Sequence, residues 1–92
     1  MTQLFFKHIV SDFDQWKSIY DSLKVSSDRQ TLGFVGSRIM RGQEDPNLVV
    51  VLEYFETLDG AKSWASSSDL SVAMGHAGVT SASEIHFLEN VT

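Results

Sequence analysis

The sequence contains no cysteine and only one proline, and it has no long apolar run. Without cysteine there are no disulfide bonds and no thiolate metal sites. No apolar stretch approaches the roughly 18 residues of a membrane-spanning helix, so the sequence does not predict a membrane protein. The start, MTQLFFKHIV, lacks a small-residue cleavage site and fits a strand better than a signal peptide. The absence of cysteine leaves the compartment unmarked, and a cytoplasmic protein is the default expectation.

Basic residues are scarce in the second half of the chain. Residues 47–92 hold six acidic residues and a single base, Lys62, whereas residues 1–46 hold six of each. The net charge is −5 at pH 7. Proteins that bind nucleic acid or an anionic membrane usually carry a basic stripe or patch. The sequence therefore predicts that neither is a partner.

Segments rich in apolar, β-branched and aromatic residues are typical of strands. This chain has such segments at residues 3–10, 34–41, 48–55 and 83–90. Residues 48–55, LVVVLEYF, form an almost unbroken apolar run, which predicts burial on both faces of a sheet. The preceding GQEDPN predicts a turn, because Pro46 suits the second turn position.

The first predicted helix follows the first strand. Ser11 is the expected N-cap, and the polar residues 25–33 predict a helix end or a loop that closes at Gly33. The apolar side chains of this helix recur at helical spacing on one face: Phe13, Trp16, Tyr20 and Leu23.

A second helix is predicted after the third strand. Thr57 can cap a helix over residues 58–67, and Asp69 can cap a short continuation over residues 70–77. Gly78 lies where a left-handed residue commonly ends a helix.

The order strand–helix–strand occurs twice, and residues 1–92 are long enough for one domain. With right-handed crossovers this order predicts an α+β, ferredoxin-like βαββαβ fold. It has a four-stranded antiparallel sheet, the first and third strands central and both helices on one face. The opposite face of the sheet also carries apolar residues, and no element of the chain is expected to cover them. This predicts a homodimer in which a second copy of the chain covers that face.

Three stretches carry a resemblance to a known family: HIVSDFDQWKSIYDS, EDPNLVVVLEYF and DLSVAMGHAGV with EIHFLE. Together they resemble the small dimeric α/β-barrel proteins related to antibiotic-biosynthesis monooxygenases. The resemblance covers most of the chain, and its motifs are largely structural. It implies a dimeric barrel with a pocket between sheet and helices. Some relatives oxygenate polyphenols with neither metal nor flavin, because the substrate anion itself reduces oxygen.

Other relatives degrade haem with a tryptophan on the second helix and a histidine ten residues later. Here the tenth residue after Trp64 is Met74, and no phosphate-binding loop is apparent. We therefore expect no cofactor, neither haem nor flavin, and no metal.

The sequence leaves three functions open. The first is a cofactor-independent monooxygenase or cyclase acting on an aromatic or polyketide-like molecule. The second is a non-catalytic protein that binds a hydrophobic ligand. The third is a structural dimer whose cavity is filled by its own side chains. No complete catalytic group of residues decides between them.

The candidate substrate-binding residues are Trp16, Tyr20, Trp64, Met74 and His76. The aromatic residues can form the wall of a cavity, although aromatics at helical spacing also form plain core. His76 lies in the last turn of its helix, where its charge complements the helix dipole, and that role alone also explains it.

The candidate catalytic residues are His8 and His86, one near the end of the first strand and one in the last. If these strands pair in the expected register, the two histidines are cross-strand neighbours. A histidine tuned by a neighbour is a suitable general base for substrate deprotonation. The alternative is a hydrogen-bonded structural histidine in each place.

Overall fold

The computed structural model describes residues 1–23, 27–80 and 83–91, and in these residues a sheet of four antiparallel strands is covered by four helices. The strands are β1 (Thr2–Ile9), β2 (Phe34–Arg41), β3 (Leu48–Phe55) and β4 (Glu84–Glu89). They lie in the order β2-β3-β1-β4, so the first and third strands are central, as their composition predicts. Every predicted strand is confirmed, and only end residues differ.

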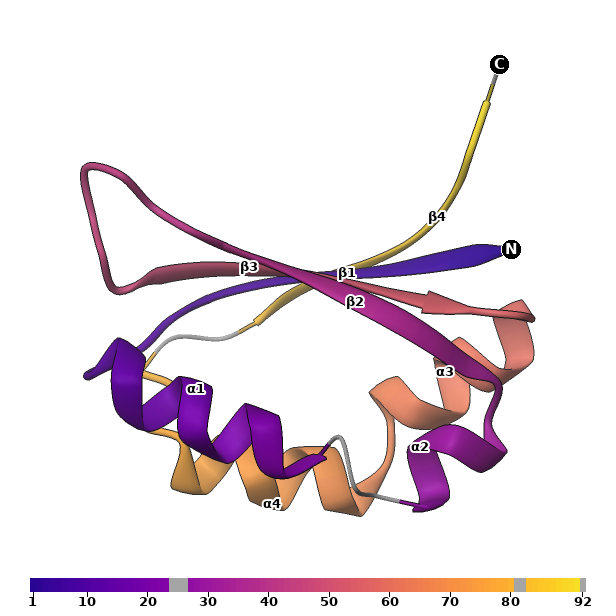
Figure 1. Ribbon diagram of the computed structural model, residues 1–92, viewed down its shortest axis with the longest axis horizontal. Helices are drawn as coiled ribbons and strands as arrows, with labels where there is room; N and C mark the ends of the chain where they lie inside the picture. The colour runs from indigo at the N-terminus through magenta and orange to yellow at the C-terminus, as the bar shows by residue number, and fades with distance from the viewer. Residues whose placement is uncertain (24–26, 81–82, 92) are drawn as a thin grey trace.

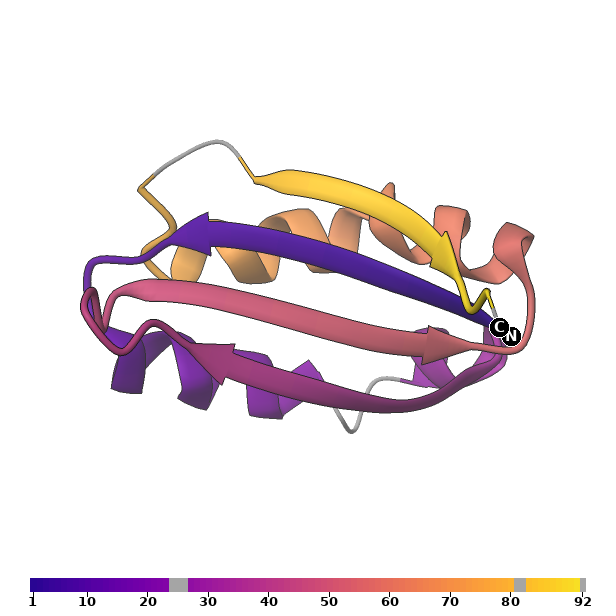
Figure 2. The same cartoon turned by 90° about the horizontal axis from the view of Figure 1, so that it is seen from above.

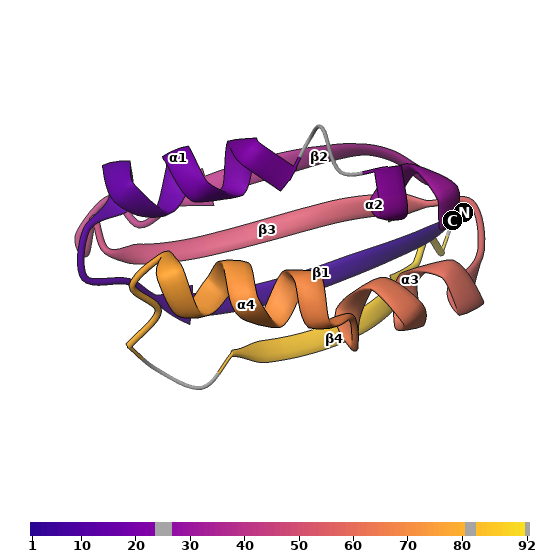
Figure 3. The same cartoon turned by 90° about the horizontal axis from the view of Figure 1, so that it is seen from below.

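All the described helices lie on the same face of the sheet (Figure 1). They are α1 (Phe13–Ser22), α2 (Ser27–Thr31), α3 (Leu58–Ala65) and α4 (Ser68–His76). Seen from the helix side, α1 and α4 lie next to each other in front of the sheet (Figure 3). The ferredoxin-like βαββαβ order is confirmed. The helix α2 is an addition, because it falls within the polar segment where the sequence predicts a helix end or a loop.

The helix caps differ from the prediction in two places. Asp12, rather than Ser11, caps α1, since its carboxylate accepts hydrogen bonds from backbone N–H groups of the first turn. Ser67, rather than Asp69, caps α4, because its hydroxyl accepts from the Leu70 N–H. The cap of α3 is Thr57, as predicted.

The end of α4 is tied to the end of β1. Gly78 has a φ of +78°, the left-handed conformation that the sequence predicts there. Its carbonyl accepts a hydrogen bond from the Ser11 N–H, and a Cβ at Gly78 would run into the Ser11 hydroxyl. Val10 forms a β-bridge with Val79. This connection holds α4 against the part of β1 that carries His8.

The two faces of the sheet differ sharply. On the helix side of the central strands, the side chains are buried and form the core, among them Leu4, Phe6, Val49, Val51 and Phe55. On the opposite side, the apolar side chains are only half-buried: Phe5, Val50, Leu52 and Tyr54. No described element covers this second face (Figure 2). The prediction that residues 48–55 are buried on both faces is therefore wrong for this chain by itself, because only the helix side of β3 is fully covered.

Candidate functional site

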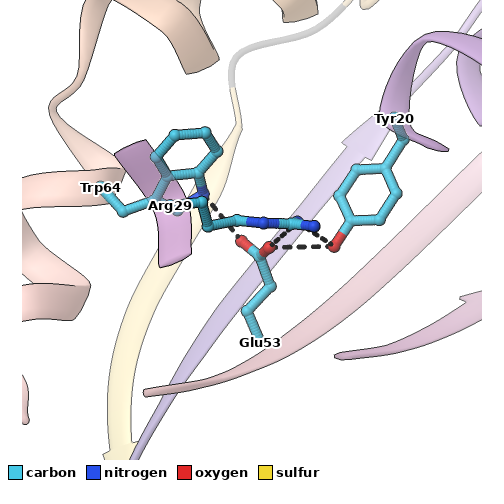
Figure 4. A network of polar contacts seen from close by, with 4 residues as sticks. All are labelled: Tyr20, Arg29, Glu53 and Trp64. Atoms are coloured by element: carbon cyan, nitrogen blue, oxygen red, sulfur yellow. Dashed lines mark hydrogen bonds and ion pairs between the residues drawn. The ribbon is translucent and has the colours of Figure 1, made fainter. Parts of the chain in front are cut away.

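A buried polar network lies between the sheet and the helices, with Glu53 at its centre (Figure 4). Glu53 points toward the helices because the alternation of β3 places it on the same face as Val51 and Phe55. A carboxyl group is costly to bury unless its oxygens are hydrogen bonded. Side chains from three different helices supply those bonds.

Each of these helices contributes one donor. The Tyr20 hydroxyl of α1 lies 2.9 Å from Glu53 Oε2, and Arg29 Nη1 of α2 lies 2.8 Å from the same oxygen. Trp64 Nε1 of α3 donates to Oε1 at 3.1 Å. All four side chains are 0% exposed. The network therefore fixes α1, α2 and α3 on β3.

The Arg29 guanidinium is also packed among aromatic rings. Its Cζ atom lies 3.8 Å from the centroid of Phe34, 5.6 Å from that of Tyr20 and 5.9 Å from that of Trp64. Such contacts stabilise a cation through the ring quadrupole. Nη1 holds the hydrogen bonds of this guanidinium, whereas Nε and Nη2 have no partner among the described residues.

Burial controls the protonation of the network. It raises the pKa of Glu53, because desolvation disfavours the carboxylate by more than Arg29 and the hydrogen bonds favour it. Burial, followed by the nearby charge of Glu53, also raises the pKa of Tyr20 above its ordinary value. Tyr20 therefore remains protonated at neutral pH and stays a hydrogen-bond donor.

His8 belongs to an aromatic cluster beside this network. Its ring lies 5.7 Å from that of Trp16, which in turn stacks on Tyr20 with centroids 5.1 Å apart. Burial lowers the pKa of His8 to about 4, so the imidazole is neutral at pH 7. Its Nδ1 lies 3.3 Å from Ser83 Oγ, whereas Nε2 has no hydrogen-bond partner in the described part of the chain.

A groove of about 420 Å³ opens between α1 and α4. Its lining includes Ile19 of α1 and Leu23, the C-cap residue of that helix, together with Asp69, Val72, Ala73 and His76 of α4. Ile19 and Ala73 also pack against the buried core, so the groove lies directly outside it. Its volume is within the range of small-molecule sites.

Several solved structures share this architecture. A crystal structure of an antibiotic biosynthesis monooxygenase covers 100% of both chains with a TM-score of 0.75 and 14% identity. SnoaB, a cofactor-independent oxygenase from Streptomyces nogalater, has a TM-score of 0.78 and 14% identity, with 99% of this chain and 93% of SnoaB covered. A conserved protein from Methanosarcina mazei has a TM-score of 0.73 and 14% identity, with 98% of this chain and 92% of that chain covered.

The chain has the fold of the antibiotic biosynthesis monooxygenases. The predicted resemblance is thus confirmed for the fold. The sequence matches no protein-family profile and no curated protein. At 14% identity, the similarity to these structures establishes the fold only. The roles of individual residues are therefore inferred from the contacts within this chain.

The predicted substrate-binding residues lie in two places in this fold. Trp16, Tyr20 and Trp64 are fully buried within the core. Met74 is partly buried and packs against that core from α4, whereas His76 is exposed and lines the groove. His76 also lies in the last turn of α4, as predicted.

The two candidate catalytic histidines lie on opposite faces of the sheet, which corrects the prediction that they are neighbours. His86 pairs with Phe5 in the β1–β4 register, so it shares the open face with that residue. His8 lies an odd number of residues from Phe5 and therefore faces the helices. His86 is exposed, and its Nε2 lies 3.3 Å from Glu84 Oε1.

Sequence reasoning missed Glu53 and Arg29. Glu53 had a detectable signal, since it is the single acidic residue inside LVVVLEYF and shares its alternation with inward-facing Val51 and Phe55. Arg29 had none, because it belongs to a polar run that resembles a solvated loop.

Among the described residues, no group of three histidine, aspartate or glutamate side chains is placed to hold a metal ion. The described helices are also all too short or too polar to cross a bilayer.

Proposed function

We propose that this protein is a homodimeric, cofactor-independent oxygenase whose substrate, an aromatic or polyketide-like molecule, binds in the groove between α1 and α4. The observation that carries the proposal is the groove itself. It has about 420 Å³ of space, mainly apolar walls, and lies against a core that contains His8 and two tryptophans. The likeness to SnoaB, described as a cofactor-independent oxygenase, supports the same class of reaction.

The proposed reaction converts an anthrone-type CH₂ group into a quinone carbonyl. A base removes a proton from the substrate, and the resulting anion transfers one electron to O₂. The substrate radical and superoxide combine to a peroxide anion, which takes the proton back. Loss of water from the hydroperoxide leaves one oxygen atom in the product and the other in water. The protein therefore has to move one proton and keep the anion away from solvent.

His8 is the residue that we assign as the base. When its Nδ1 donates to Ser83, its Nε2 presents a free lone pair. The low pKa of about 4 keeps His8 unprotonated before the reaction. Once it accepts a proton, the adjacent substrate anion stabilises the imidazolium. A substrate in the groove reaches His8 when the side chains between α1 and α4 move apart, in particular Ile19 and Ala73.

The homodimer forms through the open face of the sheet in this proposal. That face carries half-buried Phe5, Val50 and Leu52, and Leu88 of β4 is 44% exposed. A second copy would remove these apolar side chains from water. Sedimentation should give a dimer at micromolar concentration. Leu52→Lys should shift it to monomer, whereas Val72→Lys, on the exposed side of α4, should not. A monomeric wild-type protein would contradict the proposal.

Oxygen uptake with hydroquinone and hydroxyanthrone substrates tests the catalytic function. We expect uptake above that of a protein-free control. Ala73→Trp fills the groove and should abolish most of this activity, whereas Val35→Trp, exposed on β2, should retain it. Absence of uptake by the wild type across these substrates, or full activity of the Ala73→Trp variant, would contradict the proposed function.

A second function is favoured by one specific observation. Trp16, Tyr20 and Trp64 are each 0% exposed, and these side chains occupy space between the helices and the sheet: Trp16 stacks on Tyr20, and Trp64 donates to Glu53. This packing suits a non-catalytic dimer, or a protein that only binds a ligand in the groove. Such a protein would bind aromatic molecules without consuming oxygen, which the same measurement detects.

A further inference from the structure

Arg29 carries two buried donors that the described residues leave unsatisfied. The side chain is 0% exposed, yet Nε and Nη2 have no hydrogen-bond partner within residues 1–23, 27–80 and 83–91. Nη1 alone holds the contacts to Glu53 at 2.8 Å and to the Tyr20 hydroxyl at 3.4 Å. Buried donors are nearly always paired in folded proteins, so two on one guanidinium call for a specific explanation.

The geometry of these donors narrows the explanation to a class of ligand. In a guanidinium, Nε–H and one N–H of Nη2 lie parallel along the same edge of the plane. This pair matches the two oxygens of a carboxylate, which arginine commonly binds in a bidentate manner. Glu53 contacts a different nitrogen, Nη1, and so leaves this edge free.

The surroundings of Arg29 suit an apolar ligand that carries one carboxylate. The rings of Phe34, Tyr20 and Trp64 surround the guanidinium and exclude water, which strengthens a charge-assisted hydrogen bond. Tyr20 lies one helical turn from Leu23 and is adjacent to Ile19, both of which line the groove between α1 and α4. Tyr20, which Arg29 Nη1 contacts at 3.4 Å, therefore connects Arg29 to the helix that forms one wall of that groove.

We infer that Arg29 binds the carboxylate of the ligand through Nε and Nη2, so that aromatic carboxylic acids are the preferred substrates of this protein. The inference deepens the proposed function and rests on it, because the aromatic part of the ligand occupies the groove between α1 and α4. Arg29 is fully buried, so the ligand gains access only when the side chains above it move. Binding should consequently be slow compared with binding to a surface site.

Benzoate is the probe that tests this inference, and benzyl alcohol is its neutral counterpart. The chain has three arginines, so the Nε–H signal of Arg29 can be assigned by elimination in Arg38→Lys and Arg41→Lys variants. At constant ionic strength, benzoate should shift the Arg29 Nε–H signal saturably, and benzyl alcohol should not. Arg29→Lys keeps the charge but lacks the planar pair of donors, and it should weaken benzoate binding about tenfold or more. Arg38→Lys, at an exposed position of β2, should bind as the wild type does.

An Arg29 signal that does not respond to saturating benzoate would overturn the inference, as would equal responses to benzoate and benzyl alcohol. These measurements use the wild type and the two surface variants, so they decide the matter even if Arg29→Lys does not fold. They also need no oxygen. Benzoate binding without oxygen uptake would remove the oxygenase function and keep the carboxylate site. Oxygen uptake by a protein whose Arg29 Nε–H signal does not respond to benzoate would keep the oxygenase function and remove the carboxylate site.

Discussion

The two faces of the same sheet have opposite characters. On the helix side, the polar side chains Glu53 and His8 are buried among aromatic rings, and Glu53 is hydrogen bonded to three helices. On the open side, the charged residues lie in water and the apolar residues are half-exposed, as with Lys7 and Val50. Alternation along β1 and β3 produces this contrast, because neighbouring residues in one strand point to different faces.

This contrast indicates a different role for each face of the sheet. A buried, protonatable group in a dry aromatic environment has the properties of a reactive site. A half-exposed apolar surface without cover has the properties of an association surface. The helix side is therefore the candidate site, and the open side is the candidate interface.

Loss of the central carboxyl should have the largest effect on the helix side. Glu53→Ala leaves the Arg29 cation buried without its partner, and breaking a buried ion pair in this way costs about 3–5 kcal/mol. Urea denaturation measures the change in the free energy of unfolding. Glu56→Gln, in the exposed position after β3, is the matched control and should change it by less than about 0.5 kcal/mol. A loss below about 1 kcal/mol for Glu53→Ala would show that the network contributes little.

The pH dependence of stability should reflect His8. Its pKa is about 4 when folded and 6.5 ordinarily, so between these values the unfolded chain holds a proton that the folded chain lacks. The free energy of unfolding therefore rises with pH through this window, by at most about 3 kcal/mol. Glu53 acts in the opposite direction, because its raised pKa favours the folded state at low pH.

The pH dependence of the free energy of unfolding can be compared between the wild type and His8→Gln. Glu53 is present in both proteins, so the difference between the two profiles gives the contribution of His8. Urea denaturation between pH 4 and pH 7 should give a smaller stability gain for the variant. Identical pH profiles would mean that His8 is not desolvated in the folded protein.

A pair of tyrosines compares the two faces directly. Tyr20→Phe removes one donor from Glu53 and should cost about 1.5–3 kcal/mol, the usual value for a hydrogen bond to a charged group. Tyr54→Phe removes a hydroxyl from a half-buried position on the open face and should cost less than about 0.5 kcal/mol. Equal losses of stability for the two variants, measured by thermal or urea denaturation, would contradict the proposed difference between the two faces.

The smallest effect is expected for Val50→Ala on the open face. In a monomer, this half-buried side chain should contribute only about 0.5 kcal/mol. If a second copy covers the face, the loss should become larger as protein concentration rises, because folding is then linked to association. Val51→Ala, at a fully buried position on the helix side, should instead cost about 2 kcal/mol at every concentration. A concentration-independent loss for Val50→Ala would argue against the dimer interface.

The sequence predicted the fold well because the strands and the main helices carry periodic signals. The run LVVVLEYF predicted a central strand, and Gly78 predicted a left-handed helix end, and both are confirmed. The helix α2 escaped prediction since its five residues, SDRQT, have no apolar periodicity. Only the tertiary contact of Arg29 with Glu53 explains why this segment is held against the core.

The site was less predictable than the fold, because it depends on register and on long-range contacts. His8 and His86 were expected to be neighbours, yet a strand register that pairs His86 with Phe5 places them on opposite faces. Trp64 was recognised as important, but its partner Glu53 lies on a different element. Spacing along the chain carries no information about such a partner.

Comparison of His8→Gln with His86→Gln in the oxygen-uptake assay tests the central claim most directly. The two variants remove the same chemical group from opposite faces of the sheet, and each rate is normalised to the folded fraction. The predicted result is a fall of about 10²-fold or more for His8→Gln, the usual contribution of a general base, with little change for His86→Gln. A wild-type rate retained by His8→Gln, or a large loss in His86→Gln alone, would contradict the assignment of the reactive site to the helix side.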